Sequence, residues 1–501
     1  QTTYRFKDQD VHKAFKEFIE DKKHGLVKGP YISLKAPFVS AEEGYEIPLD
    51  IAPGFPPYRH QIEAFNLLTT REGHTPQNTL ITTGTGSGKT ECFLYPILDY
   101  CFRNIGRKGI KVIILYPMNA LATDQARRLA QAIYSDDRLR GNVTAGLFIG
   151  KGQDKKDFRT AMEEDGIIES REAIIANPPD ILLTNFKMLD MGIMKAEYNN
   201  LWSYNTADPD VLQFLVLDEL HTYDGAQGTD VANLIRRLKL RLGKGKGSLC
   251  GVGTSATIGS GEESKGLLCS YASDVFGEEF KTDNVIEEHR VPSSELFKGA
   301  SDPFLPSQRF MDRLTMKEDE THATYIANQK KIWMFEPDIY EESNESVALT
   351  EHLSGYQITR DLFTITEEFG IIDCESLVEK ISERNEAFNR YEPKYRMEIL
   401  SSLLALIAEA KVRSGKITIP FLPLQVQLWI RELSGIRRIV AQEPKFTWKS
   451  DLTTKDEKTI ALPMYYCREC GASGWVANKS TMQESFGLNG NNAAQMFMNH
   501  D

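Results

Sequence analysis

Residues 79–90 read Thr79-Leu80-Ile81-Thr82-Thr83-Gly84-Thr85-Gly86-Ser87-Gly88-Lys89-Thr90. The stretch begins with a short apolar run and leads into a segment with helical periodicity. Glycines let backbone N–H groups approach phosphate oxygens without a Cβ clash, and the start of a following helix favours anions. We therefore expect a strand, a phosphate-binding loop and a helix in this order. The alternative is a glycine-rich turn that binds nothing.

The same loop predicts ATP and Mg²⁺ as ligands. Lys89 is expected to reach the β- and γ-phosphates, and the Thr90 hydroxyl to bind Mg²⁺. The first loop position, usually glycine, is Thr83 here. Upstream, the amide of Gln61 can donate and accept at once, which matches the edge of adenine, and Phe55, Tyr58 or Arg59 could stack on the base. The expected nucleotide-binding residues are Gln61, Gly84, Thr85, Gly86, Ser87, Gly88, Lys89 and Thr90.

A second apolar run, Phe214-Leu215-Val216-Leu217, ends in Asp218-Glu219-Leu220-His221. We expect Asp218 to hold the metal ion and Glu219 to activate the attacking water as a general base. Together with Lys89, His221 completes the expected catalytic set. A strand that ends in two acidic residues can also be purely structural, but the phosphate-binding loop upstream favours the catalytic interpretation.

Short apolar runs alternate with helical stretches from about residue 58 to residue 290. The predicted strands are residues 79–82, 111–116, 143–148, 180–184, 214–217 and 249–253, with helices such as 61–68 and 123–134 between them. This alternation is typical of parallel βαβ units, and buried parallel strands lack polar alternation. The predicted fold is an α/β, RecA-like parallel-sheet lobe, followed by a mainly helical region and a small strand-rich module.

The predicted division of the chain has four parts. Residues 1–50 form an N-terminal extension with a helix near residues 11–22, and residues 51–290 form the RecA-like lobe. Residues 291–415 are expected to be loop-rich up to about 355 and then helical, clearest at 395–412. Residues 416–501 are expected to hold a helix at 425–434 and a strand-rich module with a Cys-x-x-Cys pair.

Composition and charge narrow the possible classes of protein. No run in the 501 residues approaches the ~20 apolar residues of a membrane helix, so no membrane partner is expected. Seven cysteines with one close pair are no disulfide framework, which indicates the cytoplasm. The net charge of −12 argues against a protein that is coated with nucleic acid. However, charges farther apart than about 8 Å are largely screened. A local basic stripe therefore matters more.

One basic stripe stands out. It contains no acidic residue and consists of Arg236, Arg237, Lys239, Arg241, Lys244 and Lys246. Cations near the end of a helix are favoured by the helix dipole and can simply be solvated. The other interpretation is contact with phosphates. The sequence leaves both open.

These motifs, in this order, resemble the DEAD/DEAH-box branch of superfamily 2 helicases. Three further segments also resemble it: residues 116–121 with Gln125, residues 180–185, and Thr254-Ser255-Ala256-Thr257. The resemblance implies that Ser255, Ala256 and Thr257 couple hydrolysis to movement of the motor lobes. It also implies a second RecA-like lobe, which is not among these residues and is expected in the same longer polypeptide. The residues expected to contact a nucleic-acid strand are Pro117, Asn119, Gln125, Thr184 and Asn185, with Arg236 and Arg237 as flanking candidates.

Residues 221–228, read as His-Thr-Tyr-Asp-Gly-Ala-Gln-Gly, followed by Arg236-Arg237-Leu238, resemble the Lhr-like group of large bacterial helicases. That group includes mitomycin-repair and anti-phage defence members. The resemblance implies an ATP-dependent helicase or translocase acting on single-stranded or tailed DNA, with defence-system subunits as possible partners. The alternatives are an ATP-gated nucleic-acid clamp, and a remodelling or scaffold subunit that does not unwind.

Cys467 and Cys470 form the Cys-x-x-Cys pair. The surrounding segment, residues 465–475, resembles a zinc-binding insertion of the defence-type members. A structural zinc site needs four ligands, and Cys374 and His500 are the other residues considered within the chain. The further ligands are therefore expected outside these residues. A tight turn with free thiols and a redox pair are the alternatives.

Overall fold

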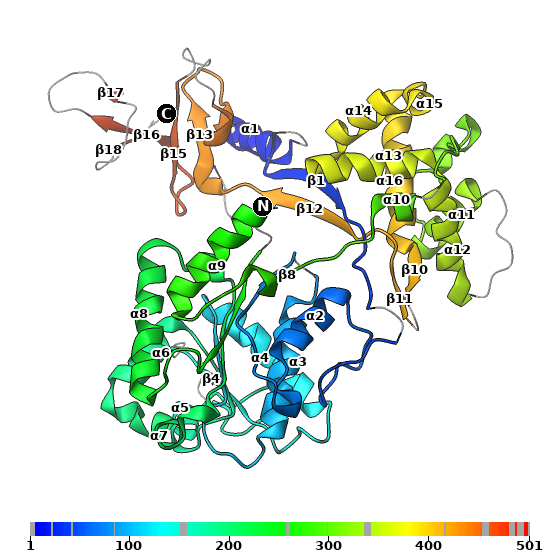
Figure 1. Ribbon diagram of the computed structural model, residues 1–501. Coiled ribbons are helices and arrows are strands. Elements are labelled where there is room, and N and C mark those ends of the chain that lie inside the picture. The colour runs from blue at the N-terminus through cyan, green and yellow to red at the C-terminus, as the bar shows by residue number, and fades with distance from the viewer. Residues whose placement is uncertain are drawn as a thin grey trace. The chain divides into compact units, whose positions relative to one another are not determined.

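The chain divides into two compact units in the computed structural model (Figure 1). One unit is Pro37–Pro292 with Arg413–Thr418, and the other is Gln1–Ala36, Ser293–Val412 and Ile419–Asp501. The structure describes residues 6–21, 24–41, 44–84, 86–150, 158–256, 261–297, 299–334, 342–414, 417–452, 460–479, 486–487 and 495–498.

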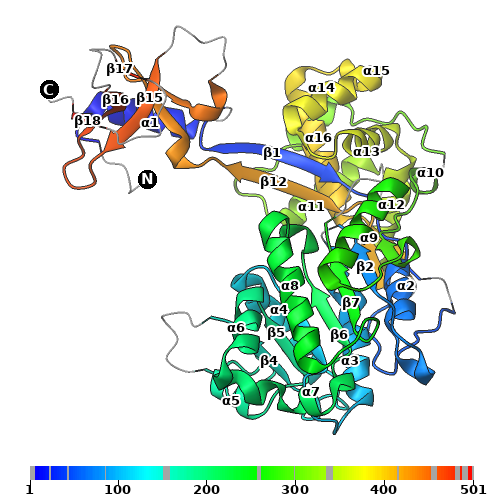
Figure 2. The same ribbon diagram turned by 60° about the vertical axis from the view of Figure 1, so that its left-hand side comes forward.

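A seven-stranded parallel sheet forms the centre of the first unit, in the order β4-β5-β3-β6-β7-β2-β8. Figure 2 labels five of these strands, β4, β5, β6, β7 and β2. Its strands are β2 (Thr79–Thr82), β3 (Val112–Leu115), β4 (Ala145–Phe148), β5 (Ile181–Thr184), β6 (Phe214–Leu217), β7 (Cys250–Thr254) and β8 (Val285–Glu287). The predicted parallel α/β fold is confirmed, and all six predicted strands are present. The short strand β8 at the edge was not predicted.

Helices cover both faces of this sheet. On one side, Val112 and Ile114 are buried in a core that includes α2 (Arg59–Leu68), α3 (Lys89–Arg103) and α4 (Asn119–Tyr134). On the other side, Ile113 and Leu115 are buried in a second core. Its helices are α5 (Arg171–Ala176), α6 (Phe186–Met194), α8 (Gly225–Leu242) and α9 (Glu262–Phe276), and the short α7 (Ser203–Ala207) contacts α8. Successive strand residues point to opposite faces, so burial on both faces requires an uninterrupted apolar run.

Six helices surround the main core of the second unit. They are α11 (His322–Trp333), α12 (Glu342–Gly355), α13 (Gln357–Phe369), α14 (Cys374–Arg384), α15 (Glu386–Asn389) and α16 (Pro393–Glu409), with the single turn α10 (Ser293–Leu296) before them. The expectation of a loop-rich segment up to residue 355 is therefore wrong for α11 and α12. The few apolar residues of α11 are used for contact with α16: Trp333 is fully buried and its indole N–H donates to the Ser402 hydroxyl at 2.9 Å.

A two-stranded ribbon, β1 (Val27–Leu34) and β12 (Leu424–Ile430), runs through the second unit (Figure 1). The pairing is antiparallel, and the short strand β9 (Ile372–Asp373) adds to β1. The helix predicted at residues 425–434 is wrong. A helix satisfies its hydrogen bonds locally, whereas this strand obtains them from β1 at the other end of the chain, which periodicity within one segment cannot reveal.

Helix α1 (Gln9–Glu20) begins at Asp8, whose carboxylate accepts hydrogen bonds from the N–H groups of Asp10 and Val11. Phe6, Val11 and Phe15 pack against Phe446 and Trp448 in a small core. The sheet on the other side of this core has the order β14-β13-β15-β16-β17, and β18 pairs with β16. Its strands are β13 (Ile436–Ile439), β14 (Phe446–Trp448), β15 (Ala461–Tyr466), β16 (Ser473–Lys479), β17 (Phe486–Gly487) and β18 (Gln495–Met498), while β10 (Lys411–Ser414) and β11 (Ile417–Pro420) form a separate pair.

Helices long and apolar enough to cross a membrane are absent from the described part of the chain.

Two leucines of α8 test the packing on this face of the parallel sheet. Leu238 is fully buried, whereas Leu240 is 82% exposed. Leu238→Ala is expected to lower the free energy of unfolding by about 2–5 kcal/mol, because it leaves a cavity. Leu240→Ala, the matched control, is expected to change it by less than about 0.5 kcal/mol. Urea unfolding measures both, and equal values would contradict the assigned orientation of the helix.

Candidate active site

The glycine-rich loop leaves the carboxyl end of β2 and enters α3. Gly88 caps this helix with a φ of 75°, in the left-handed region, and Gly86 has a φ of 81°. A Cβ on Gly88 would lie 2.3 Å from the Gln61 amide nitrogen, so both conformation and space require glycine there. Thr83 and Ser87 close the loop through their hydroxyls, 2.6 Å apart. Thr85 lies outside the described residues.

Helix α2 fastens this loop from the side. The side-chain oxygen of Gln61 accepts a hydrogen bond from the Tyr58 N–H at 2.9 Å, and its NH₂ donates to the Gly88 carbonyl at 3.3 Å. His60 is fully buried, and its Nε2 lies 2.8 Å from the Ser87 carbonyl. A carbonyl can only accept, so Nε2 carries the proton. Burial lowers the pKa of His60, in keeping with this neutral role.

Two residues after β8 also reach the loop, and sequence reasoning missed them. Glu288 accepts a hydrogen bond from the Gly84 N–H at 2.8 Å and pairs with Arg290 at 2.6 Å. The Arg290 guanidinium lies 4.1 Å from the ring centroid of Phe38, which in turn packs on Tyr58. No motif marks these positions. Only the pairing of the short strand β8 with β2 brings them here.

Strand β7 lies between β2 and β6, and it determines which groups meet across the site. Lys89 Nζ is 3.8 Å from Glu219 Oε1 and 3.5 Å from the Ser255 carbonyl oxygen. The lysine therefore lies between the end of β7 and the acidic pair after β6. The predicted catalytic residues Lys89 and Glu219 are brought together although 130 positions separate them in the sequence.

The acidic pair is held in place by Thr254 at the end of β7. Its hydroxyl donates to Asp218 Oδ1 and accepts from the Glu219 N–H at 3.1 Å. Glu219 has a φ of 51°, a conformation that costs a non-glycine residue energy and is found at functional sites. Desolvation by burial raises the pKa of Asp218, with the neighbouring Glu219 charge adding to the effect. Thr254 belonged to a predicted motif, but its contact with both acidic residues was not foreseen.

His221 completes the cluster from the turn after β6. Its Nδ1 lies 3.4 Å from Glu219 Oε2 and 3.2 Å from the Ser255 hydroxyl. The predicted coupling segment thus touches the catalytic set through Ser255. Ala256 is exposed beside it, and Thr257 lies outside the described residues.

The donor groups fit a Mg²⁺ ion bound with nucleotide. Mg²⁺ prefers carboxylate and hydroxyl oxygens, which Asp218 at the end of β6 and Thr90 in the first turn of α3 supply. Thr254 donates a hydrogen bond to one oxygen of Asp218, and the carboxylate keeps further lone pairs that could hold a metal ion. When bound, Mg²⁺ neutralises charge on the phosphates.

A polar rim continues the same edge of the sheet past β3 and β5. Met118 is 58% exposed, and the Asn185 amide donates to the side-chain oxygen of Asn119 at 2.7 Å. Pro117 and Gln125 are half-buried beside them. Thr184, in contrast, is fully buried and donates to the Phe148 carbonyl. Pro117, Asn119, Gln125 and Asn185 are thus accessible for a strand, but the Thr184 side chain is not.

The basic stripe on α8 is largely engaged within the first unit. Arg236 donates to the Asp274 carbonyl at 2.9 Å, and Arg237 pairs with Asp190 at 2.8 Å. Lys239 is buried against Glu278. At 1.5 Å per residue, Arg236 lies about 16 Å along the helix from its start at Gly225, so the structure does not bring it to the rim.

Cys467 and Cys470 lie in a tight turn between β15 and β16, closed by the Gly471 N–H donating to the Cys467 carbonyl at 3.0 Å. Both thiols are free. Within the described ranges, groups of three or more metal-binding side chains do not occur. Cys374 is half-buried on α14, and His500 lies outside the described residues.

A parallel sheet of this order, with a phosphate-binding loop after one strand and an Asp-Glu pair two strands away, defines a P-loop nucleoside triphosphatase of RecA-like fold. Residues 58–264 match the family model described as DEAD/DEAH box helicase. These residues therefore form a DEAD/DEAH helicase domain, which implies ATP hydrolysis, as the motifs predicted.

Known relatives agree with this assignment. An uncharacterized ATP-dependent helicase of Methanocaldococcus jannaschii is 26% identical over 286 residues, which cover 55% of this chain and 38% of the relative. Druantia protein DruE of Escherichia coli is 26% identical over 313 residues, which cover 44% of this chain and 17% of DruE. The Lhr helicase of Mycolicibacterium smegmatis is 27% identical over 279 residues, which cover 49% of this chain and 17% of the relative. These relatives are consistent with the predicted resemblance to the Lhr-like group. The chain spans less than half the length of each of them.

Among solved structures, the helicase MrfA bound to DNA and AMPPNP is similar with a TM-score of 0.38 and 22% identity. The match covers 56% of this chain and 34% of that one.

Two variants separate the roles of Lys89 and Glu219. Glu219→Gln is expected to reduce ATP hydrolysis by about 10²–10⁴-fold, the usual contribution of a general base, with nucleotide binding kept. Lys89→Ala is expected to weaken binding by about 10–100-fold, because a charge-assisted hydrogen bond contributes about 1.5–3 kcal/mol. Titration with a fluorescent ATP analogue and steady-state hydrolysis measure both. Full turnover by Glu219→Gln would contradict the assignment.

Proposed function

We propose that this chain contributes the nucleotide-binding lobe of an ATP-dependent helicase or translocase that moves along single-stranded or tailed DNA. The main support is the pairing of Lys89 with Glu219 across β7, at 3.8 Å. It unites the phosphate-binding loop with a general base, as ATP hydrolysis requires. The Ser255 carbonyl contacts the same lysine, so the segment expected to couple hydrolysis to movement is in direct contact with the catalytic set.

The nucleic-acid track is proposed along the rim after β3 and β5. The side chains of Asn119 and Asn185 are hydrogen-bonded to each other there, and Met118 is exposed. The rim continues the sheet edge that carries the ATP site, so a change at the phosphates can reach a bound strand over a short distance. We assign the coupling to Ser255, Ala256 and Thr257.

A second RecA-like lobe is proposed as the partner of this one. In phosphoryl transfer an arginine that reaches the γ-phosphate is worth about 10³–10⁵ in rate, and the helicase resemblance assigns that arginine to the second lobe. The similarity to Druantia protein DruE supports a place in a defence system. The alternative is an ATP-gated clamp that binds and remodels nucleic acid without unwinding. Strand displacement measured beside ATP hydrolysis separates the two.

A charge placed on the rim tests the track. Asn119→Asp is expected to lower the affinity for single-stranded oligo-dT by about tenfold, since like charges juxtaposed at an interface cost up to several kcal/mol. Asn142→Asp is the matched control. Asn142 is exposed and precedes β4, so it lies at the amino ends of the strands, whereas the rim lies at their carboxyl ends. Fluorescence anisotropy measures binding. Equal affinities of the two variants would contradict the proposal that the rim contacts the nucleic-acid strand.

We also propose that Cys467 and Cys470 are half of a structural zinc site whose other ligands lie outside the described residues. A structural zinc contributes about 10–16 kcal/mol of apparent binding energy, so its loss should loosen the strand-rich module. Cys467→Ser is expected to abolish bound zinc in elemental analysis of the purified protein, whereas Cys374→Ser on α14 should leave it unchanged. Because the further ligands are expected outside these 501 residues, the measurement uses a longer polypeptide, and negligible zinc in its unsubstituted form would exclude the site.

A further inference from the structure

The sheet of the strand-rich module presents different residues on its two faces. Residues that pair directly across antiparallel strands point to the same face, and the faces alternate along each strand. Ile436 pairs with Trp448, and both are buried in the small core against α1. Met464 and Tyr466 pack on the same core. This face therefore supplies the contacts with α1.

The other face carries Arg437 and Tyr465. Arg437 pairs with Pro463, and Tyr465 pairs with Gly474, so Tyr465 has no side chain opposite it. A hollow of about 460 Å³ lies here, within the range of ~300–1,000 Å³ typical of ligand sites. Arg437, Tyr465 and Arg468 are among the residues that line it, and its lining includes no carboxylate. The half-buried phenol ring thus lines the hollow beside two cations.

The two arginines are available for an anion. Arg437 is held in place, because its Nη1 donates to the carbonyls of Ser434 and Ile436, both at 2.9 Å. Arg468 is exposed in the turn after β15. No ion pair joins either guanidinium to a carboxylate of the described residues. Glu432 and Glu469 are close in sequence but do not line the hollow.

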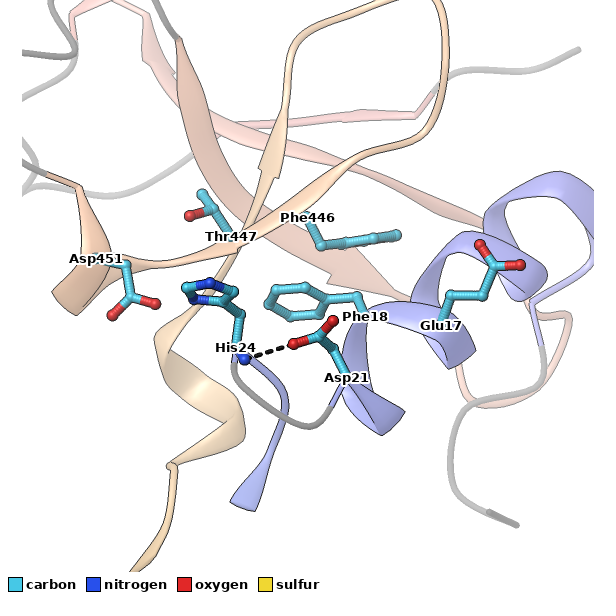
Figure 3. Close-up of a pocket in the computed structure, with 7 residues that line it drawn as sticks. All are labelled: Glu17, Phe18, Asp21, His24, Phe446, Thr447 and Asp451. Carbon is cyan, nitrogen blue, oxygen red and sulfur yellow. Dashed lines mark hydrogen bonds between the residues drawn. The ribbon is translucent and has the colours of Figure 1, made fainter. Parts of the chain in front are cut away.

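A second hollow of the same module has the opposite character (Figure 3). It lies between the end of α1 and β14, with Phe18 and Phe446 at its centre and the carboxylates of Glu17, Asp21 and Asp451 around them. Like charges repel the phosphates of a polyanion there. Carboxylates line this hollow and none lines the other, so the Tyr465 face is the one on which a polyanion can lie.

We infer that the Tyr465 face is a second nucleic-acid contact, which binds one nucleotide of a single strand. The base stacks on the Tyr465 ring beside Gly474, and Arg437 and Arg468 contact the flanking phosphates. Surfaces that bind single strands combine such stacking platforms with cations along the backbone. A folded protein partner would offer no exposed base for the ring. The inference rests on the proposed function in one respect, that the chain acts on nucleic acid.

Binding of single strands to the whole chain tests this. Tyr465→Ala is expected to reduce affinity for oligo-dT by about fivefold to a hundredfold, the usual effect of one lost stacking contact, while Tyr465→Phe keeps the ring and the affinity. Arg437→Ala with Arg468→Ala should lower the slope of log affinity against log salt by about 1.4, because each contact with a single strand accounts for about 0.7. Oligo-U in parallel separates DNA from RNA.

Two controls and one independent measurement make the outcome decisive. Tyr45→Ala and Arg390→Ala remove exposed residues of the same types elsewhere in the chain and should change neither quantity. Photo-crosslinking of 5-iodouracil oligonucleotides to the unsubstituted protein should label the peptide that contains Tyr465, without any risk of misfolding. Binding and slope unchanged in all variants, with crosslinks confined to residues 37–292, would overturn the inference. Failure of the unsubstituted protein to bind any strand would instead contradict the proposed function.

Discussion

The parallel hydrogen bonding of β2, β7 and β6 is the constraint on which the ATP site depends. Ile81 is paired with Thr254, and Leu217 with Gly253, so the three strands end at one edge. Because side chains alternate between the faces of a sheet, a shift of one residue would reverse every buried side chain. Each face packs against its own set of helices, so such a reversal would disrupt both cores. The register in turn sets the approach of Lys89 to Glu219, which lie 3.8 Å apart.

At the same edge of the sheet, two residues of the site adopt left-handed backbone conformations, which are energetically unfavourable for residues other than glycine. Gly88 adopts a left-handed conformation at the start of α3, and Glu219 does so without being a glycine. Thr254 holds Glu219 there by accepting its N–H. A rigid sheet under these turns lets charged groups face a nucleotide in fixed positions, which reduces the reorganisation needed at the moment of reaction.

The second unit uses its charges differently. Its strand-rich module buries aromatic side chains against α1 and keeps acidic and basic groups in separate hollows. For a chain with a net charge of −12, such separation is what allows a local surface to attract a polyanion, because screening makes distant charges ineffective. The global charge therefore says little about where a strand can bind.

The sequence by itself determined the parallel lobe, since burial on both faces requires apolar runs such as Val112–Leu115 and since phosphate binding requires the glycines before Lys89. It also identified Asp218 and Glu219, because an acidic pair after a buried strand is a local pattern. Only the tertiary structure placed Glu288 at Gly84, turned residues 424–430 into a strand, and placed Tyr465 opposite Gly474. Each of these depends on a partner distant in the sequence, and a local pattern holds no information about which distant segment will satisfy its hydrogen bonds.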